Sequence, residues 1–461
     1  MTNQDSNPSS WLSLQLGQVI DYGQTEKVEP DNISSQTWVL ELEDIERDTS
    51  RLLKRLTYAE RPSKSTKNSF SPGDVLYGKL RPYLNKVIYA DASGVCSTEI
   101  IPLKPNLAVD SRYLFHWIRH PEFLAYTSQV SHGVNMPRLG TEAGRQAPFI
   151  LAPINEQRRI ADKLDRVLAR VDATNEHLSR VAPLIKRFRQ SVLAAATSGR
   201  LTEDWREQNT IKLTETSSEI DSFRTSQLPE LPHSWSWKPF SSIARVSSNL
   251  QDPSEHTDSI HLAPNHVESW TGRIYGVRTI AEDGVTSPKH KFNAGQIIYS
   301  KIRPNLCKVA IPNFSGLCSA DMYPIDTDIH VHYLAYWMRS QKFTDWASNA
   351  ESRTVLPKIN QAQLNTLPVP VPSSQEEQSE IVRRVEKLFA FADRLEERLS
   401  QAQAAVQKLT PALLAKAFRG ELVPQDPNDE PASELLKRLQ ESQTESAKPS
   451  RARKPRTKKA P

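Results

Sequence analysis

Apolar residues recur at alternating steps of four and three in two long stretches of the chain. The first stretch contains Ile160, Leu164, Val167, Val171, Leu178 and Ile185, and the second contains Ile381, Val385, Leu388, Leu395, Leu399 and Val406. The two seams match at a constant interval of 221 residues, with Ala392 opposite Val171 and Thr174 opposite Leu395. This spacing is the heptad seam of a coiled coil. Because neither stretch is apolar all round, each predicted helix requires a partner, and the obvious partner is the other stretch.

An amphipathic helix lying on its own domain would also show an apolar stripe, and it stays open as the alternative. A helix over residues 154–197 would be roughly 65 Å long. Pro183 and Pro411 lie inside the two stretches at non-equivalent places, and each predicts a bend or a break in its helix. Paired antiparallel, the two helices would form a rod with one globular domain near each end.

A block of alternating apolar and polar residues also occurs twice. Gly73-Asp-Val-Leu-Tyr-Gly-Lys-Leu-Arg-Pro returns as Gly295-Gln-Ile-Ile-Tyr-Ser-Lys-Ile-Arg-Pro, and the likeness runs without a gap to Gly94-Val-Cys-Ser and Gly316-Leu-Cys-Ser. The β-branched and aromatic residues predict strands here. An apolar stripe of helical spacing follows each block, at Tyr113–Arg119 and Tyr333–Arg339. The chain is therefore predicted to be α+β, with two mixed α/β domains in tandem, joined by two long helices packed as an antiparallel coiled coil, with pseudo-two-fold symmetry.

The order of these patterns divides the chain into six predicted parts. Trp11 and Trp235 each precede apolar residues five and eight positions on, so the second copy begins near Trp235. The parts are a globular domain (1–152), a long helix (153–205), a polar linker (206–228), a second globular domain (229–371), a second long helix (372–425) and a disordered basic tail (426–461).

The net charge of +5 comes from the end of the chain. Seven Lys and Arg residues lie in the last 14 positions, and the rest of the chain carries −2. Bulk charge is therefore no evidence for nucleic-acid binding by the folded part, and the tail adds either phosphate attraction or solubility. Three cysteines without a Cys-x-x-Cys pair argue against disulfides and a zinc site. Without a membrane-spanning or signal segment, the protein is expected in the cytoplasm.

Motifs of catalysis are missing from the sequence. It has no Gly-rich ATP loop, no dinucleotide-binding turn, no Asn/Asp-Pro-Pro-Tyr/Phe tetrapeptide of amino-methylating enzymes and no clustered metal ligands. Glu99 and Asp321 occupy equivalent places in the two copies, where a buried or capping role is expected rather than a paired catalytic one. No catalytic residue and no metal site is predicted, and the inventory favours a binding scaffold.

The doubled set of motifs resembles the specificity subunit of type I restriction-modification systems. Beside the two blocks, each long helix has a Pro-x-x-x-Glu-Gln-x-x-Ile lead-in, at Pro153–Ile160 and, one residue longer, at Pro372–Ile381. Each helix ends at a Gly-x-Leu motif, Gly199-Arg-Leu201 and Gly420-Glu-Leu422. The resemblance covers roughly Trp11 to Asp426, and its specificity lies in the doubled order.

The resemblance implies two target recognition domains that bind double-stranded DNA at a split, asymmetric site. It also implies two methyltransferase subunits, which modify adenine with S-adenosylmethionine, and restriction subunits, which cut DNA with ATP and Mg²⁺. No cofactor is expected on this chain, which would be a non-catalytic subunit. A stand-alone nuclease and a coiled-coil adaptor that binds protein remain the alternatives.

The repeat also sorts the candidate DNA contacts. If the half-sites differ, residues identical in both copies cannot distinguish them, so shared cations are predicted to position the phosphate backbone. These are Lys79, Arg81, Lys86, Lys301, Arg303 and Lys308. Base reading is expected in the divergent segments 25–68, 128–138, 249–291 and 348–358, with Asn135, Arg138, Arg353 and Lys358 as candidates. For each candidate, a solvated side chain or an internal ion pair is the competing interpretation.

Overall fold

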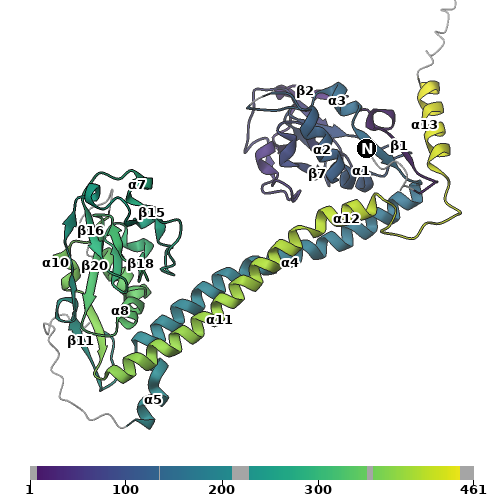
Figure 1. The fold of residues 1–461 in the computed structure, drawn as a ribbon. Coiled ribbons are helices and arrows are strands. Elements are labelled where there is room, and N and C mark those ends of the chain that lie inside the picture. The colour runs from purple at the N-terminus through teal and green to yellow at the C-terminus, as the bar shows by residue number, and fades with distance from the viewer. Residues whose placement is uncertain (1–7, 134, 210–227, 350–356, 447–461) are drawn as a thin grey trace, which may run out of the picture. The chain divides into compact units, whose positions relative to one another are not determined.

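The computed structural model describes residues 8–133, 135–209, 228–349 and 357–446. It divides into two compact units, one formed by residues 1–178 with 402–461 and the other by residues 179–401. Figure 1 shows the course of the chain through its helices and strands. Each unit contains one copy of the sequence repeat, so each is described by itself.

The first unit holds a mixed α/β domain. Its five-stranded sheet has the order β2-β5-β8-β3-β4, formed by Lys27–Val28, Lys67–Phe70, Gly94–Cys96, Trp38–Leu40 and Leu56–Thr57. A three-stranded sheet, β7-β6-β9, contains Val87–Tyr89, Val75–Gly78 and Ile100–Leu103, and a ribbon pairs β1 (Leu12–Gln15) with β10 (Pro148–Leu151). The helices are α1 (Ser111–Ile118), α2 (Pro121–Val130) and α3 (Thr141–Arg145).

The second unit repeats this topology. Its five-stranded sheet runs β13-β16-β19-β14-β15, formed by Leu250–Gln251, Lys289–Phe292, Gly316–Cys318, Ile260–Leu262 and Arg278–Thr279. The other sheet is β12-β20-β17-β18, from Ala244–Val246, Met322–Thr327, Ile297–Ser300 and Val309–Ala310, and β11 (Trp235–Pro239) pairs with β21 (Pro368–Pro372). The helices are α7 (Ile280–Asp283), α8 (Val331–Met338), α9 (Gln341–Asn349) and α10 (Gln361–Asn365). The strand order confirms that the sequence repeat is a repeat of fold.

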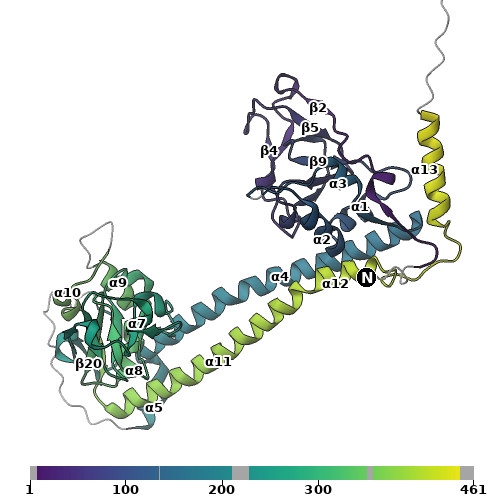
Figure 2. The same ribbon diagram turned by 45° about the horizontal axis from the view of Figure 1, so that its top comes forward.

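The predicted strands and short helices are where the patterns placed them. The Gly73 and Gly295 blocks form β6 with β7 and β17 with β18, and the apolar stripes form α1 and α8. In the first unit, α1 and α2 lie between the sheets and the long helices (Figure 2). Trp117 of α1 contacts Phe418 beyond α12, with ring centroids 4.9 Å apart. The domain core and the helix pair are therefore one hydrophobic cluster in this unit.

The long helices pair antiparallel within each unit. They are α4 (Ile154–Thr197), α11 (Gln375–Gln407) and α12 (Leu409–Ala417), with the short α5 (Glu203–Gln208) after α4. In the unit of residues 179–401, Val192 and Leu193 of α4 pack with Ile381, Val382 and Val385 of α11. In the other unit, Ile160 and Leu164 share a cluster with Leu414 and Ala417. The predicted seam residues are buried or half-buried in both units.

The two prolines behave differently. Helix α4 continues through Pro183, whereas the second helix is interrupted at Lys408, and Pro411 lies in the first turn of α12. A proline is tolerated there because the first turn has no intrahelical acceptors for its N–H groups. The break shifts the seam, since Leu409 is 44% exposed and Leu414 is buried instead. Continued by its own spacing, the heptad would place Leu409 in the seam, and this expectation is wrong because of the local break.

The predicted disordered tail 426–461 was wrong for its first part. Residues Ala432–Ser446 form a helix, α13, whose Ala432, Leu435 and Leu439 are buried in the core of the first unit. The three- and four-residue spacing of these apolar side chains gives the helix a face to bury, which the prediction from overall charge overlooked. The basic residues from 448 onward lie outside the described part of the chain.

Candidate nucleic-acid interface

In both units the repeated block turns sharply where its central strand ends. After β6 the chain passes Lys79 and Arg81 and enters a short 3-10 helix at Pro82–Leu84, and after β17 it passes Lys301 and Arg303 into Pro304–Leu306. Arg81 and Arg303 have left-handed backbones, with φ of 51° and 46°. So have Asn85 and Cys307 at the other end of the turn, with φ of 46° and 48°. A left-handed backbone conformation is unfavourable by about 1–3 kcal/mol for each of these four non-glycine residues. Backbone strain of this kind is concentrated at functional sites.

The strained turn is held by the segment that precedes α3 or α10. The Arg81 N–H donates to the Pro137 carbonyl and the Arg303 N–H donates to the Pro357 carbonyl, each over 2.7 Å. Leu80 forms an isolated antiparallel β-bridge with Arg138, and Ile302 forms one with Lys358. Residues predicted for backbone contact and residues predicted for base reading are thus neighbours in each unit.

Each unit has one ion pair beside this turn, and the two pairs occupy equivalent places. The Arg138 guanidinium lies 3.1 Å from Glu99, and the Lys358 ammonium lies 3.1 Å from Asp321. All four side chains are at least partly exposed, at 48%, 27%, 41% and 44% in that order. Glu99 and Asp321 therefore each hold a divergent cation beside the shared block. Both carboxylates are partly exposed, whereas the sequence suggested a buried or capping role.

The shared cations Lys79, Arg81, Lys301 and Arg303 remain accessible to different degrees. Arg303 is exposed, and the other three are half-buried. The Lys301 ammonium lies 4.8 Å from the centre of the Tyr323 ring. Burial, and secondarily the nearby Lys358 ammonium, lowers the pKa of Lys301. An anion that approached this turn in the second unit would relieve that repulsion.

Lys86 and Lys308 are turned inward by the same contact in both units. The Lys86 ammonium donates to the Leu42 carbonyl over 2.6 Å, and the Lys308 ammonium donates to the Pro264 carbonyl. Each carbonyl belongs to the first residue of a 3-10 helix, Leu42–Asp44 or Pro264–His266. The lysines thus tie the strained turn to the next loop, and this internal contact is a competing role to the phosphate contact that the sequence predicts.

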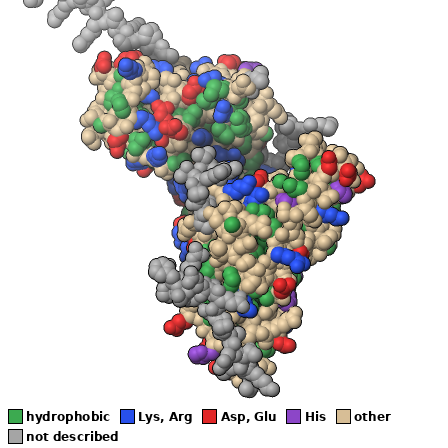
Figure 3. All heavy atoms as spheres, turned by 90° about the vertical axis from the view of Figure 1, so that its left-hand side faces the viewer, with side chains coloured by type: hydrophobic (Ala, Val, Ile, Leu, Met, Phe, Trp, Pro, Cys, Tyr) green, Lys and Arg blue, Asp and Glu red, His purple; other side chains and the backbone are tan. Residues whose placement is uncertain are grey.

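The other two candidates for base reading differ in what is known of them. Asn135 is exposed in the loop between α2 and α3. Arg353 lies outside the described residues. On the face drawn in Figure 3, Lys and Arg side chains occur singly or in small groups among acidic and apolar ones, without one dominant basic patch. Shape and individual contacts, rather than bulk charge, must therefore define any DNA surface on this face.

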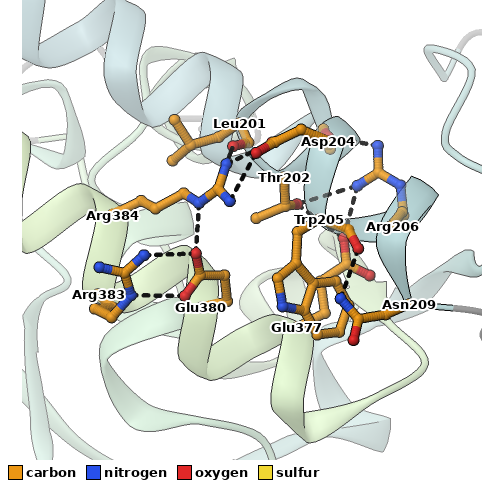
Figure 4. A network of polar contacts seen from close by, with 11 residues as sticks. Leu201, Thr202, Asp204, Trp205, Arg206, Asn209, Glu377, Glu380, Arg383 and Arg384 are labelled. Carbon is orange, nitrogen blue, oxygen red and sulfur yellow. Dashed lines mark hydrogen bonds and ion pairs between the residues drawn. The ribbon is translucent and has the colours of Figure 1, made fainter.

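A second matched feature lies where the long helices begin and end. Glu377, at the start of α11, is buried and accepts hydrogen bonds from Thr202 at 2.8 Å and Arg206 at 2.6 Å, both just beyond α4 (Figure 4). Beside it, Arg384 bridges Glu380 and Asp204. The hydrogen bond from Arg383, followed by that from Arg384, lowers the pKa of Glu380 to about 2. These contacts lock the start of one helix to the segment that follows the other.

The first unit contains the equivalent joint with other partners. Glu156, at the start of α4, accepts a hydrogen bond from the Trp11 indole at 2.8 Å and another from Gln425, beyond α12. Arg159 pairs with Asp429 over 2.6 Å. The sequence motif that contains Glu156 and Glu377 is therefore a structural joint, a role that its residue types alone did not reveal.

Sequence reasoning missed one further matched element, a loop of pattern Glu-x-x-Thr-x-Arg. It occurs at Glu46–Arg51 and at Glu268–Arg273, with the same interval between copies as the Gly73 and Gly295 blocks, and this interval is the signal that would have found it. In both loops the Thr hydroxyl donates to the Glu carboxylate. Within the described ranges, no helix is long and apolar enough to cross a membrane, and no group of acidic, His and Cys side chains is arranged to hold a metal.

Comparison with known proteins points to one family. A family model described as type I restriction modification DNA specificity domain matches residues 43–182 and 270–402. The EcoDI type I restriction enzyme specificity subunit of Escherichia coli is 54% identical over 273 residues, which cover 59% of this chain and 61% of that protein, less than two thirds of its length. The EcoBI specificity subunit of Escherichia coli is 30% identical over 359 residues, covering 72% of this chain and 69% of that protein.

Solved structures agree on the fold. The HsdS subunit from Thermoanaerobacter tengcongensis matches with a TM-score of 0.55 and 18% identity, over 91% of this chain and all of that one. A chain from a structure of type I R-M system assembly and conformational transition matches with a TM-score of 0.68 and 17% identity, over 90% of this chain and 99% of that one. At such identities the likeness concerns fold alone.

Proposed function

Because the chain belongs to the family of type I restriction-modification DNA specificity proteins, we propose that it is a DNA-recognition subunit whose two domains each read one half of a split target. The observation that carries the proposal is the doubled interface. In each unit the same strained turn, shared cations and matched ion pair stand beside divergent segments. One binding geometry with two sets of reading residues suits two different half-sites.

The shared cations are assigned to the DNA backbone. Lys79 and Arg81, with Lys301 and Arg303, follow a central strand at the same place in both units. Sequence-independent contacts of this kind fix the register of a protein on the duplex. The strain of the turn fits this role, since a rigid backbone holds the cations in one place without DNA.

The divergent cations are assigned to base edges. Arg138 and Lys358 are exposed and held by carboxylates. Exposed ion pairs contribute only about 0–1 kcal/mol, so exchange of the carboxylate for a guanine edge or a phosphate costs little. Arg pairs with guanine through two hydrogen bonds, whereas Lys makes a point contact, so the two units would read their words differently.

Methylation and cutting are assigned to partner subunits. The resemblance implies two methyltransferase subunits using S-adenosylmethionine and restriction subunits using ATP and Mg²⁺. The curated relatives are named as specificity subunits of restriction enzymes, which supports this division of labour. This chain then recognises the DNA target, and its partners methylate or cut the DNA.

We place one contact with a partner subunit on α11. Lys387, Phe391, Arg394 and Arg398, here called the α11 stripe, are spaced by four, three and four residues and share one face of the helix. Phe391 is 48% exposed. In the described part of the chain the three cations of the stripe make no ion pair, while acidic Asp393 and Glu396 are engaged elsewhere. Exposed aromatic surface among unpaired cations suits an acidic protein surface with an apolar side chain at its centre.

The proposal is tested by mapping methylated adenines in cells. Cells that express the chain with a methyltransferase subunit of its family are compared with cells that express the methyltransferase subunit alone. We expect methylation at one split motif, with two short fixed words and a constant spacer, only when the chain is present. Methylation that is unchanged by the chain, or that falls on a continuous motif, would contradict the proposal.

A further inference from the structure

In the unit of residues 179–401, the loop Glu268–Arg273 reaches from the globular domain to the long helices. The Arg273 guanidinium lies 2.6 Å from Asp393 and 2.8 Å from Glu396, both on α11. Arg189 of α4 lies 2.7 Å and 3.2 Å from the same two carboxylates. These four residues, Arg189, Arg273, Asp393 and Glu396, are here called the charged latch.

One residue of the charged latch is shielded from water, whereas Arg273 and Asp393 are 51% and 52% exposed. The Arg189 side chain is only 10% exposed and stacks over Phe389, with 5.1 Å between the guanidinium carbon and the ring centre. Burial alone would raise the pKa of Asp393, but the hydrogen bonds from Arg189 and Arg273 outweigh it and hold this pKa below its ordinary value. A network of two cations and two carboxylates in this setting is worth more than an isolated surface pair.

The loop itself is held rigid. Arg339, which is half-buried, donates to the Thr271 carbonyl over 2.7 Å, and the Lys186 ammonium of α4 lies 5.4 Å from the centre of the Trp270 ring. Gly272 has a φ of 73°, and a Cβ there would lie 2.2 Å from the Val309 carbonyl oxygen. Arg273 is therefore presented to α11 by a loop with little freedom.

The matched loop in the other unit lacks this attachment. Glu46–Arg51 has the same fold, with left-handed Asp48 and Ser50 in the places of Trp270 and Gly272. Within the described residues, the Arg51 guanidinium pairs with Glu46 of its own loop at 3.0 Å and with no helix. At the helix positions that correspond to Glu396, Arg189 and Lys186, the first unit has Asn175, Thr410 and Gln407. Asp172 corresponds to Asp393, so the first unit lacks counterparts of two of the four residues of the charged latch, Arg189 and Glu396.

The charged latch lengthens the contact between domain and helix. Near its start, α11 is tied to the domain by the His330 N–H, which donates to Gln378 over 2.8 Å. Glu396 lies further on, about 27 Å along the helix from Gln378. In the described part of the first unit, side-chain bonds between the domain and α4 run from Glu156 to Asp165, about 14 Å. Two anchors far apart resist tilting better than anchors close together.

We infer that Arg273 is a positioning residue, which fixes the angle of the second recognition domain on its helices and thereby the place at which the second half-site is read. This inference rests on the proposed function for its DNA consequence, but not for the attachment itself. The first domain is held to its helices differently, by a core that is continuous with the helix pair and by side-chain bonds near the start of α4.

The attachment is tested without DNA by hydrogen exchange on the full chain. In Arg273→Ala, the amides of residues 268–273 should exchange at least threefold faster than in the wild type, and high salt should move the wild type toward the variant. Arg273→Lys should restore part of the protection, because a charge remains. Arg51→Ala is the matched control, and its effect should stay within residues 46–51. Unchanged exchange in Arg273→Ala would overturn the charged latch.

The positioning role is tested with duplexes that carry the split motif obtained by methylation mapping. The wild type, bound to its methyltransferase partner, should prefer the native spacer over spacers longer or shorter by one base pair. In Arg273→Ala the ratio of the affinity for the native spacer to that for an altered spacer should fall by roughly three- to tenfold. The affinity for a duplex with the first half-site alone should stay unchanged. Faster exchange with an unchanged spacer preference, or an equal effect of Arg51→Ala, would overturn the positioning role. A failure to find any split motif would count against the proposed function, and the exchange measurement would still decide the attachment.

Discussion

At the residue scale, the two copies form equivalent contacts with different side chains. Arg138 with Glu99 corresponds to Lys358 with Asp321. The repeat singled out candidate positions, because identical residues at equivalent places of the two copies are expected to share a role. It did not predict that Lys86 turns inward, because its acceptor, the Leu42 carbonyl, lies 44 residues away in a divergent segment. Contacts that join shared to divergent sequence cannot be found from the repeat alone.

Arg81 and Lys86 are expected to give different results when they are replaced. Arg81→Ala should weaken binding to all DNA sequences about equally and reduce the slope of log affinity against log salt by about 1, since one phosphate contact is lost. Lys86→Met should leave that slope unchanged and lower stability, because the Leu42 carbonyl loses its partner. Fluorescence anisotropy with random-sequence duplexes at several salt concentrations measures the slopes. An unchanged slope for Arg81→Ala would remove it from the interface.

Arg138 is expected to act on sequence preference instead. Its guanidinium stands beside the shared block but belongs to a divergent segment. Arg138→Ala should therefore cost about 1–3 kcal/mol against one base pair of the first half-site and leave the second half-site unaffected. Arg353→Ala should do the same in the second. Competition binding with single-base substitutions measures this, and a uniform loss across all sequences would assign Arg138 to the backbone.

His120 makes the stability of the first unit depend on pH. It caps α2 and stacks on Trp117 with 4.9 Å between ring centres. Burial, with a smaller contribution from Arg419, lowers its pKa to about 4. Against an unfolded value of about 6.5, its contribution is complete above pH 6.5 and is lost as pH falls toward 4, by up to about 3 kcal/mol.

This pH dependence is tested with His120→Ser, which copies Ser340, the matched residue of the second unit. The variant should be less stable at pH 7 because ring packing is lost, but its unfolding free energy should fall less steeply between pH 6.5 and 4. Urea unfolding at several pH values gives the slope. His177→Ser, on the exposed face of α4, should keep the wild-type slope, and an equal slope in His120→Ser would contradict the assignment.

At the element scale, periodicity predicted the long helices well because burial against a partner is what selects the pattern. Helix α4 spans residues 154–197, as the seam and its flanks indicated. The seam failed only after Lys408, where a single missing N–H at Pro411 interrupts the helix and rotates the following turns. A proline in the sequence predicts that the helix breaks nearby. The heptad register after the break depends on the packing of Leu414 and Phe418 in the first unit, which the proline does not reveal.

The displaced seam predicts unequal costs for two similar substitutions. Ile381→Ala removes a fully buried side chain from the helix pair and should cost about 2–4 kcal/mol of unfolding free energy. Leu409→Ala, at a position that the strict heptad also assigns to the seam, should cost less than about 0.5 kcal/mol because Leu409 is 44% exposed. Urea unfolding followed by circular dichroism compares them, and equal costs would mean that the seam continues through Lys408.

At the scale of the whole molecule, sequence reasoning identified two copies of one unit but not how each unit closes. In each unit a buried glutamate at the start of one long helix is bonded to the segment beyond the other, Glu377 to Arg206 and Glu156 to Gln425. The partners differ in chemistry because only the glutamates belong to the repeated motif. The same holds for α13, which packs on the core of the first unit and has no counterpart among the described residues of the second. Parts that close a repeat need not repeat themselves.

The α11 stripe carries the last prediction, which concerns assembly. Charge reversal in Arg394→Glu with Arg398→Glu should lower the affinity for the methyltransferase subunit at least tenfold, since both cations are unpaired among the described residues and would face an acidic surface. Phe391→Ala should cost about 2 kcal/mol or more if the ring is the central anchor. Glu397→Arg, exposed on another face of the same helix, is the matched control and should bind as the wild type does. Titration calorimetry on the full chain measures each affinity. If the double reversal binds as tightly as the control, the partner must dock elsewhere, and the stripe is then free to meet the phosphates of the spacer DNA instead.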